Sequence, residues 1–229
     1  MVRARTLRQR DPHPGLLTGR LWQALGLGTA IAVAVALVTL GVSIAGTGRD
    51  SATRRVGPEG VLLQRGPALA PAASPAPGRS VDGIACGAGE ALTYHVHAHL
   101  AVFVRGAPRS IPLGIGIGPP LQVAATDGGR FAAAGRCFSY LHTHASDGIV
   151  HVEAPTISDF TLGQFFDVWG QRLDRDHVGP ATGRVTAFVG GRRFSGDPRR
   201  IPLAPHAQIQ LDVGRPAIAP QRVSFPAGL

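Results

Sequence analysis

The sequence predicts a β-rich α+β domain, with a mixed sheet and one short amphipathic helix, preceded by a single transmembrane helix. Three patterns indicate this fold class: an uncharged apolar run near the N-terminus, alternating apolar residues in several later segments, and one segment with helical periodicity. Gly and Pro together account for 50 of the 229 residues, 31 and 19 respectively, whereas only 6% are aromatic. This composition favours a turn-rich sheet over a helical bundle.

The apolar run covers residues 21–45 and contains no charged side chain. About 20 apolar residues cross a bilayer as a helix. Five Arg precede the run and three follow it closely, which favours a cytoplasmic N-terminus and an extracytoplasmic remainder. The alternative is a cleaved signal peptide, although the run exceeds the roughly 7–15 apolar residues of such a peptide. We therefore expect a single-pass cell-membrane protein.

The charge is concentrated around the predicted anchor. Residues 1–79 contain ten Arg and three acids, which is +7 of the formal net charge of +9. The remaining residues are close to neutral, so we expect no nucleic-acid partner; the Arg residues are placed instead to contact acidic lipid headgroups. All 23 basic residues are Arg, and the lack of Lys excludes a Walker-type phosphate loop and Lys Schiff-base chemistry.

Composition shifts predict five parts of the chain. Residues 1–20 form an Arg-rich cytoplasmic tail, 21–45 the transmembrane helix and 46–80 a linker rich in Pro and Ala. Residues 81–215 form the extracytoplasmic domain, and 216–229 are a C-terminal tail.

Alternation of apolar and polar residues predicts the strands of the domain. One strand covers residues 96–104 and ends at a turn over 106–108, and a second covers 110–117. Residues 138–144 and 149–153 are expected to form a hairpin around the turn-type run 146–148.

One helix is predicted after this hairpin. Thr161 is its expected N-cap, with Gln164 completing a capping box, and Gly170 ends it. Large apolar residues at helical spacing between these positions indicate a face buried in the core. Three strands follow: one at 185–189, one that ends at residue 194, and one at 208–213. This order resembles the β-grasp arrangement of the ubiquitin-like superfamily over residues 138–213, but the chain does not end in the Gly-Gly of conjugated members.

Six of the nine histidines fall within 57 residues, and this cluster is the main functional signal. On a strand, alternate side chains share one face, so His95, His97 and His99 are expected to face away from the core. A four-residue hairpin loop would place His142 opposite His151, and a two-residue loop would place His144 there; both put Glu153 on the same face. The predicted metal ligands are His95, His97, His99, His142, His144 and His151.

Imidazole is the commonest protein ligand of transition metals, and an His-x-His strand with a neighbouring His is a common ligand set. The only Met is Met1, so we expect divalent Zn or Cu as the cofactor and not a Met-rich Cu(I) site. Glu153 is the candidate catalytic residue, as a general base or a further ligand. Binding should weaken as pH falls through about 6.5.

Two cysteines, Cys86 and Cys137, lie a few residues before the two His-bearing segments. In an extracytoplasmic domain such a pair most often forms a disulfide. The alternative is that one of them is a thiolate ligand of a copper site.

Three sequence motifs together, YHVHAHLAVFV, LHTHASDGIVHVE and FTLGQFFDVWG, resemble an uncharacterised family of membrane-anchored bacterial proteins over residues 86–213. This resemblance implies a membrane anchor and no particular activity. The leading hypothesis is thus a membrane-anchored protein that binds a metal for handling or sensing. The alternatives are a His-ligated metalloenzyme of the hydrolase, hydratase or copper oxidase type, and a metal-free envelope interaction module.

Overall fold

The computed structural model describes residues 55–229. The predicted cytoplasmic tail and transmembrane helix lie outside these residues, as does the first part of the predicted linker. Among residues 55–229, no helix is both long enough and apolar enough to cross a membrane.

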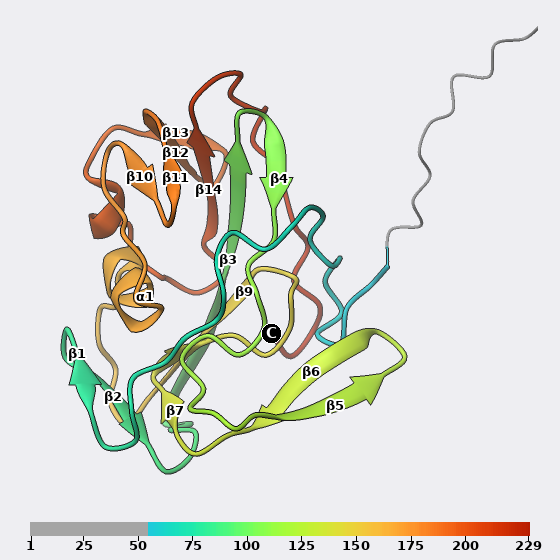
Figure 1. Ribbon diagram of the computed structural model, residues 1–229, viewed down its shortest axis with the longest axis vertical. Helices are drawn as coiled ribbons and strands as arrows, with labels where there is room; N and C mark the ends of the chain where they lie inside the picture. Colours follow the sequence, from blue (N-terminus) through green and yellow to red (C-terminus); the bar gives the residue numbers. More distant parts are fainter. Residues whose placement is uncertain (1–54) are drawn as a thin grey trace, which may run out of the picture. The chain divides into compact units, whose positions relative to one another are not determined.

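A mixed sheet forms the centre of the domain (Figure 1). Its strand order is β13-β12-β14-β3-β9-β8, with β4 also paired to β3. The two central strands, β3 and β14, run parallel, and the other pairs are antiparallel. The strands are β13 (Arg192–Phe194), β12 (Val185–Val189), β14 (Gln208–Val213), β3 (Tyr94–Val104), β9 (Ile149–Ala154), β8 (Leu141–His142) and β4 (Ala107–Arg109). The predicted β-rich α+β class is confirmed.

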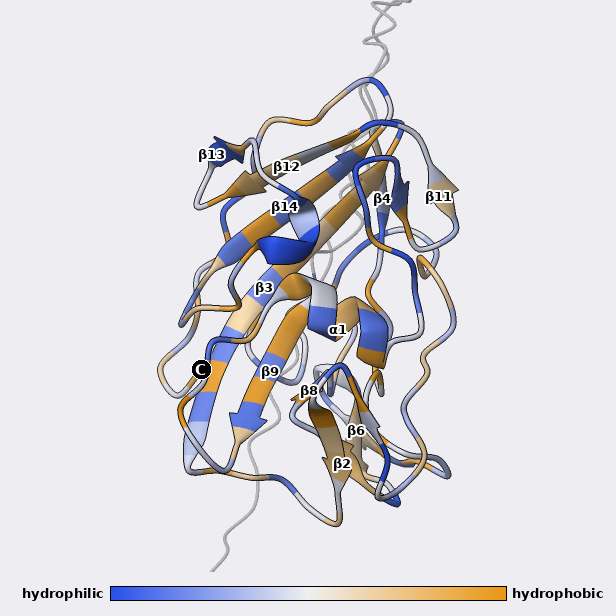
Figure 2. Cartoon of the chain, turned by 90° about the vertical axis from the view of Figure 1, so that its left-hand side faces the viewer, coloured by the Kyte–Doolittle hydropathy of each residue, from blue (hydrophilic) through white to orange (hydrophobic). Residues whose placement is uncertain are grey.

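The sheet has one apolar face. Alternate residues of β3, β9 and β14 point to that face and are almost completely buried, including Leu100, Val152 and Leu211. Helix α1 (Leu162–Val168) covers it with Phe165, Phe166 and the C-cap residue Trp169. Figure 2 shows α1 lying across the strands, and the alternation of apolar and polar residues is visible along β3. The predicted aromatic stripe is therefore core.

The local sequence explains the bounds of the helix. The Thr161 side chain accepts a hydrogen bond from the Gln164 backbone N–H, and the Gln164 side chain accepts one from the Thr161 backbone N–H. This is the predicted capping box, which stabilises the first turn. Gly170 follows the C-cap at a φ of +66°, a conformation that ends helices at little cost for Gly.

Smaller elements surround the sheet. Three strands, β1 (Ser80–Val81), β2 (Ile84–Gly87) and β7 (Phe138–Ser139), form one small sheet. Two hairpins are β5 (Gln122–Thr126) with β6 (Gly129–Ala134), and β10 (His177–Val178) with β11 (Ala181–Thr182). A short 3₁₀ helix, η1, covers Pro198–Arg200. In Figure 1 the β5–β6 hairpin lies on the side of the sheet opposite α1.

The predicted second strand at 110–117 is not present. The chain turns there, because Gly114 and Gly116 take φ values of +83° and +73°, which no strand tolerates. Gly116 also passes so close to the chain at Leu141 that a Cβ would lie 2.3 Å from its carbonyl oxygen. The strand pairing occurs later, in β5–β6, around an Asp127-Gly128 turn that the prediction overlooked.

The second face of the sheet is polar but not open to solvent. Residues 55–64, which belong to the predicted linker, pack against the domain: Val61 is buried and the Gln64 side chain donates to the Leu100 carbonyl. At the other end of the sheet, the C-terminal segment bonds to Gln208 and Gln210 of β14. Residues 55–64, expected to belong to a spacer, are thus part of the folded unit, because Val61 and Gln64 find partners there.

Candidate metal centre

A row of histidines crosses three adjacent strands on the polar face. His97 of β3 is directly opposite His151 of β9, and His142 of β8 is opposite His151 from the other side. This is the register expected for the four-residue hairpin loop. His95 is opposite Glu153 in the next row. The His151 ring lies at the centre, with ring centroids of His97, His142 and His144 between 4.5 and 5.2 Å away.

Two sets of side chains have ligand atoms close enough to hold a metal ion. The inner group is His142, His144, His151 and Glu153, and all four residues are buried. The outer group is His95, His97 and His151, of which His95 is exposed. Within each group the ligand atoms lie within 4.8 Å of one another, and His151 belongs to both.

His142 and His144, the inner pair, each carry their proton on a defined ring nitrogen. His142 donates from Nδ1 to the Ser139 carbonyl at 2.9 Å, and His144 donates from Nδ1 to the Ala132 carbonyl at 2.6 Å. A carbonyl only accepts, so each Nδ1 carries the proton and each Nε2 of a neutral ring presents a lone pair. These two Nε2 atoms are 3.0 Å apart. Two lone pairs at this distance repel each other unless a cation lies between them.

A metal ion fits this arrangement. Zn–N distances are about 2.0–2.1 Å, so two nitrogens 3.0 Å apart can both bind one ion, and an outward shift of about 0.3 Å gives a tetrahedral angle. Histidines that bind metal almost always donate their other ring N–H to a carbonyl or carboxylate, which holds the ring in place. Both inner histidines already do so.

Carboxylates surround the histidines. Glu153 Oε1 lies 3.1 Å from His95 Nε2, 3.2 Å from His151 Nδ1 and 3.7 Å from His142 Nε2. Glu59, from the segment that precedes the domain core, places Oε1 2.5 Å from His151 Nε2. At the rim, Glu90 Oε1 lies 3.4 Å from His144 Nε2.

Burial and neighbouring charges shift the histidine pKa values in opposite directions. Burial and nearby imidazoles lower the pKa of His142 well below its usual value, and burial also lowers that of His144. Burial together with the charge of His151 lowers the pKa of His97 to about 3. For His151, burial lowers the pKa, but hydrogen bonds to Glu153 and Glu59 outweigh it and raise the pKa to about 9. Without metal, His97, His142 and His144 are therefore neutral rings beside a protonated His151.

One buried carboxylate oxygen of the cluster has no partner. Within residues 55–229, Glu153 Oε2 is buried and makes no hydrogen bond. A buried polar group without a partner costs roughly 1–3 kcal/mol. Asp147 and Glu59, by contrast, share a side-chain hydrogen bond, and burial together with the charge of Glu59 raises the pKa of Asp147. Glu153 Oε2 therefore fits a site for a cation.

Aromatic rings form the wall of the inner group. Phe131 of β6 stacks on His144 with centroids 4.6 Å apart and planes 7° from parallel. Phe138 of β7 contacts His142 edge-on at 5.5 Å. An apolar wall around a metal site limits the access of water and holds the rings in one orientation.

The two cysteines form a disulfide, which confirms the leading sequence prediction. Cys86 and Cys137 are joined with their Cα atoms 5.4 Å apart. Neither cysteine is therefore a thiolate ligand. The bond attaches β2 to the chain immediately before Phe138 and Ser139, two residues that contact His142.

The remaining histidines of residues 55–229 belong to neither group, although the His206 backbone N–H donates to the His97 carbonyl. His99, a predicted ligand, bonds through Nε2 to the Asp147 backbone carbonyl at 3.0 Å and lines a separate cavity of about 580 Å³. His206 is exposed, and His177 bonds to Asp174. His13 lies outside the described residues. The structure thus brings five of the six predicted ligands together.

Two carboxylates that contact the histidines, Glu59 and Glu90, were not predicted from the sequence. Glu59 lies in a segment without periodicity, so no pattern placed it near a strand. One signal was available: Glu59 is the only acidic residue between Asp50 and Asp82. No comparable signal points to Glu90, which contacts His144 only through the three-dimensional fold.

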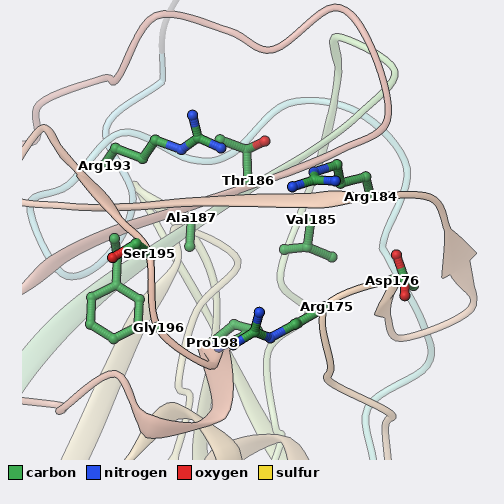
Figure 3. Close-up of a pocket in the computed structure, with 11 residues that line it drawn as sticks. Arg175, Asp176, Arg184, Val185, Thr186, Ala187, Arg193, Ser195, Gly196 and Pro198 are labelled. Carbon is green, nitrogen blue, oxygen red and sulfur yellow. The ribbon is translucent and has the colours of Figure 1, made fainter.

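A different cavity lies at the far end of the sheet. It measures about 370 Å³ and is lined by residues of β12 and β13 and by the loop before β10. Figure 3 shows three arginines around it, Arg175, Arg184 and Arg193, together with Asp176. None of the eight histidines within residues 55–229 lines this cavity. The histidine centre lies instead on the polar face of the sheet.

Comparison with known protein families, curated proteins and solved structures finds no match to this chain.

Proposed function

We propose that this protein binds a divalent transition metal, Zn or Cu, at the inner group and acts in metal handling or sensing. The observation that carries the proposal is the His142–His144 pair. Two buried Nε2 atoms lie 3.0 Å apart, and backbone carbonyls hold both rings in the tautomer that presents lone pairs to each other. A cation between the two Nε2 atoms would bind both lone pairs and remove the repulsion.

The ligand types support zinc or copper. Imidazole and carboxylate are the donors of the inner group, and imidazole suits both Zn(II) and Cu(II). Because both cysteines are in a disulfide and the only Met is Met1, soft sulfur donors for Cu(I) are lacking at the centre.

The proposed location is the outer side of the cell membrane. A disulfide is typical of oxidising compartments outside the cytoplasm, and the apolar run at 21–45 with its flanking arginines supports a single N-terminal anchor. We also infer a β-grasp-like core. The parallel pairing of β3 with β14, and the helix between β9 and β12, support that interpretation.

Metal titration of the full-length chain tests the proposal. The protein is purified in detergent, analysed for its metal content, stripped of metal and titrated with Zn(II) and with Cu(II) against a competing chelator. We expect a Kd below the micromolar range for at least one ion. The variant His142→Ala should lose this binding, whereas His177→Ala, outside the cluster, should keep it.

Micromolar or weaker binding of both ions by the wild-type chain would contradict the proposal. If, in addition, His→Ala changes in the cluster left stability and partners unaffected, the metal-free interaction module would be favoured.

A metalloenzyme is the second candidate, favoured by the second oxygen of Glu153. Oε2 is buried and has no partner, while Oε1 contacts three imidazoles. In an enzyme this oxygen would accept a proton from the substrate or from water, and the metal would supply a Lewis acid. Glu153→Gln would then keep the metal but lose turnover. In a metal carrier the same change would alter affinity only.

A further inference from the structure

We propose that the centre holds two metal ions, a tightly bound one in the inner group and a weaker one in the outer group, with His151 shared between them. This inference rests on the proposed function and adds the number of ions and the order in which they bind.

The outer group has the spacing of a metal site. His95 Nε2 and His97 Nε2 are 3.0 Å apart, the same separation as in the inner pair. A ligand nitrogen of His151 completes the group within 4.8 Å of both. Three imidazoles with one open position are a common ligand set for Zn.

His151 and Glu153 connect the two groups. An imidazole has two ring nitrogens, and in His151 both contact carboxylates: Nδ1 contacts Glu153 and Nε2 contacts Glu59. Glu153 Oε1 lies 3.1 Å from His95 of the outer group and 3.7 Å from His142 of the inner group. Its second oxygen is buried and free.

Carboxylates lie beside both groups. Glu153 Oε1 lies 3.1 Å from His95 Nε2 of the outer group, and Glu90 Oε1 lies 3.4 Å from His144 Nε2 of the inner group. Glu59 contacts His151, which belongs to both groups. Negative charge is therefore available next to a cation at either group.

The two groups differ in access. The His95 side chain is 37% exposed, whereas that of His142 is 0% exposed. The outer ion should therefore exchange faster with solvent and bind more weakly, and it should enter after the inner site is filled.

Stoichiometry of the metal-stripped, full-length chain tests this proposal. With Zn(II), we expect two equivalents for wild type and for the matched control His177→Ala. We expect one equivalent, at unchanged affinity for the first ion, for His95→Ala and His97→Ala. His97 is buried, so the exposed His95 provides the variant that is safe for folding, and circular dichroism confirms the fold of both.

Cu(II) provides an independent measurement. At one equivalent, the electron paramagnetic resonance signal should be that of an isolated ion; at two equivalents, magnetic coupling should broaden or remove it. In His95→Ala the isolated signal should persist. Saturation of the wild type at one equivalent overturns the two-ion proposal and leaves the proposed function standing, whereas the absence of any binding overturns both.

Discussion

The inner pair, His142 and His144, and the outer pair, His95 and His97, have the same Nε2–Nε2 separation but different surroundings. In the inner pair, Ser139 and Ala132 carbonyls hold the Nδ1–H groups, and Phe131 and Phe138 pack against the rings. In the outer pair, within residues 55–229, neither Nδ1 has a hydrogen-bond partner, and one ring is exposed.

The outer pair can relax without metal, because one ring can turn its proton toward the other and form an ordinary hydrogen bond. The inner pair cannot do so without breaking a buried bond to the backbone. The distance between the nitrogens therefore does not by itself show that a pair is preorganised for a cation. The hydrogen bonds and packing on the far side of each ring decide this.

The largest effect should follow loss of the disulfide. Its ends are 51 residues apart, and in the chain-entropy model the double change of Cys86 and Cys137 to Ser lowers the free energy of unfolding by about 4 kcal/mol. Thermal unfolding followed by near-UV circular dichroism measures this change. Because Cys137 precedes Phe138 and Ser139, binding at the inner pair should weaken and binding at the outer pair should not. Equal weakening of both would contradict the comparison.

Removal of one inner ligand should affect metal binding next most strongly. His142→Ala removes a proposed ligand, so the affinity for the first ion should fall by more than the 10–100-fold that changes around a metal site usually cause. His97→Ala should leave the first affinity unchanged, since that ring belongs to the outer group. Competition titration measures both. A larger loss in His97→Ala than in His142→Ala would reverse the roles of the two pairs.

The pH dependence of metal binding should distinguish His151, whose pKa is raised, from His142 and His144, whose pKa values are lowered. The pKa of His151 is raised to about 9, so metal binding at pH 7 must release its proton. Apparent affinity should therefore increase between pH 7 and pH 9, by up to about tenfold per pH unit, and level off above. The lowered pKa values of His142 and His144 keep those rings neutral below pH 6.5. Titrations at several pH values measure this.

A steep loss of affinity centred at pH 6.5, with no change between pH 7 and pH 9, would contradict that assignment. It would indicate that the ligands titrate as solvent-exposed histidines, which is the behaviour expected from the sequence alone.

Sequence periodicity was sufficient for the sheet faces and for the composition of the cluster. Alternation along β3 and β9 placed Val96 and Val152 on one face and the histidines on the other. This was possible because the two-residue period of a strand is a local property. The capping box defined the start of α1 for the same reason.

The missing parts depend on contacts between distant residues. Glu59 reaches His151 across 92 positions in the chain, and Ala132 reaches His144 through a hairpin that the prediction did not include. The histidine face was predicted to point away from the core, but no pattern indicated that residues 55–64 and β6 cover it. Nothing in a single strand's pattern specifies what packs above it. Five of the six histidines that the sequence singled out come together, whereas the groups that orient them could not be predicted.

The smallest effect should come from Glu90, the carboxylate at the rim of the inner group. Its side chain is 33% exposed and lies 3.4 Å from His144 Nε2. Exposed ion pairs contribute about 0–1 kcal/mol, so Glu90→Gln should change the first metal affinity by less than about fivefold. Glu153→Gln, the buried counterpart, should cost 10–100-fold. If Glu90→Gln instead weakened binding as much as Glu153→Gln, Glu90 would be a ligand, and the inner pair would depend on a solvent-facing group and not on buried carbonyls alone.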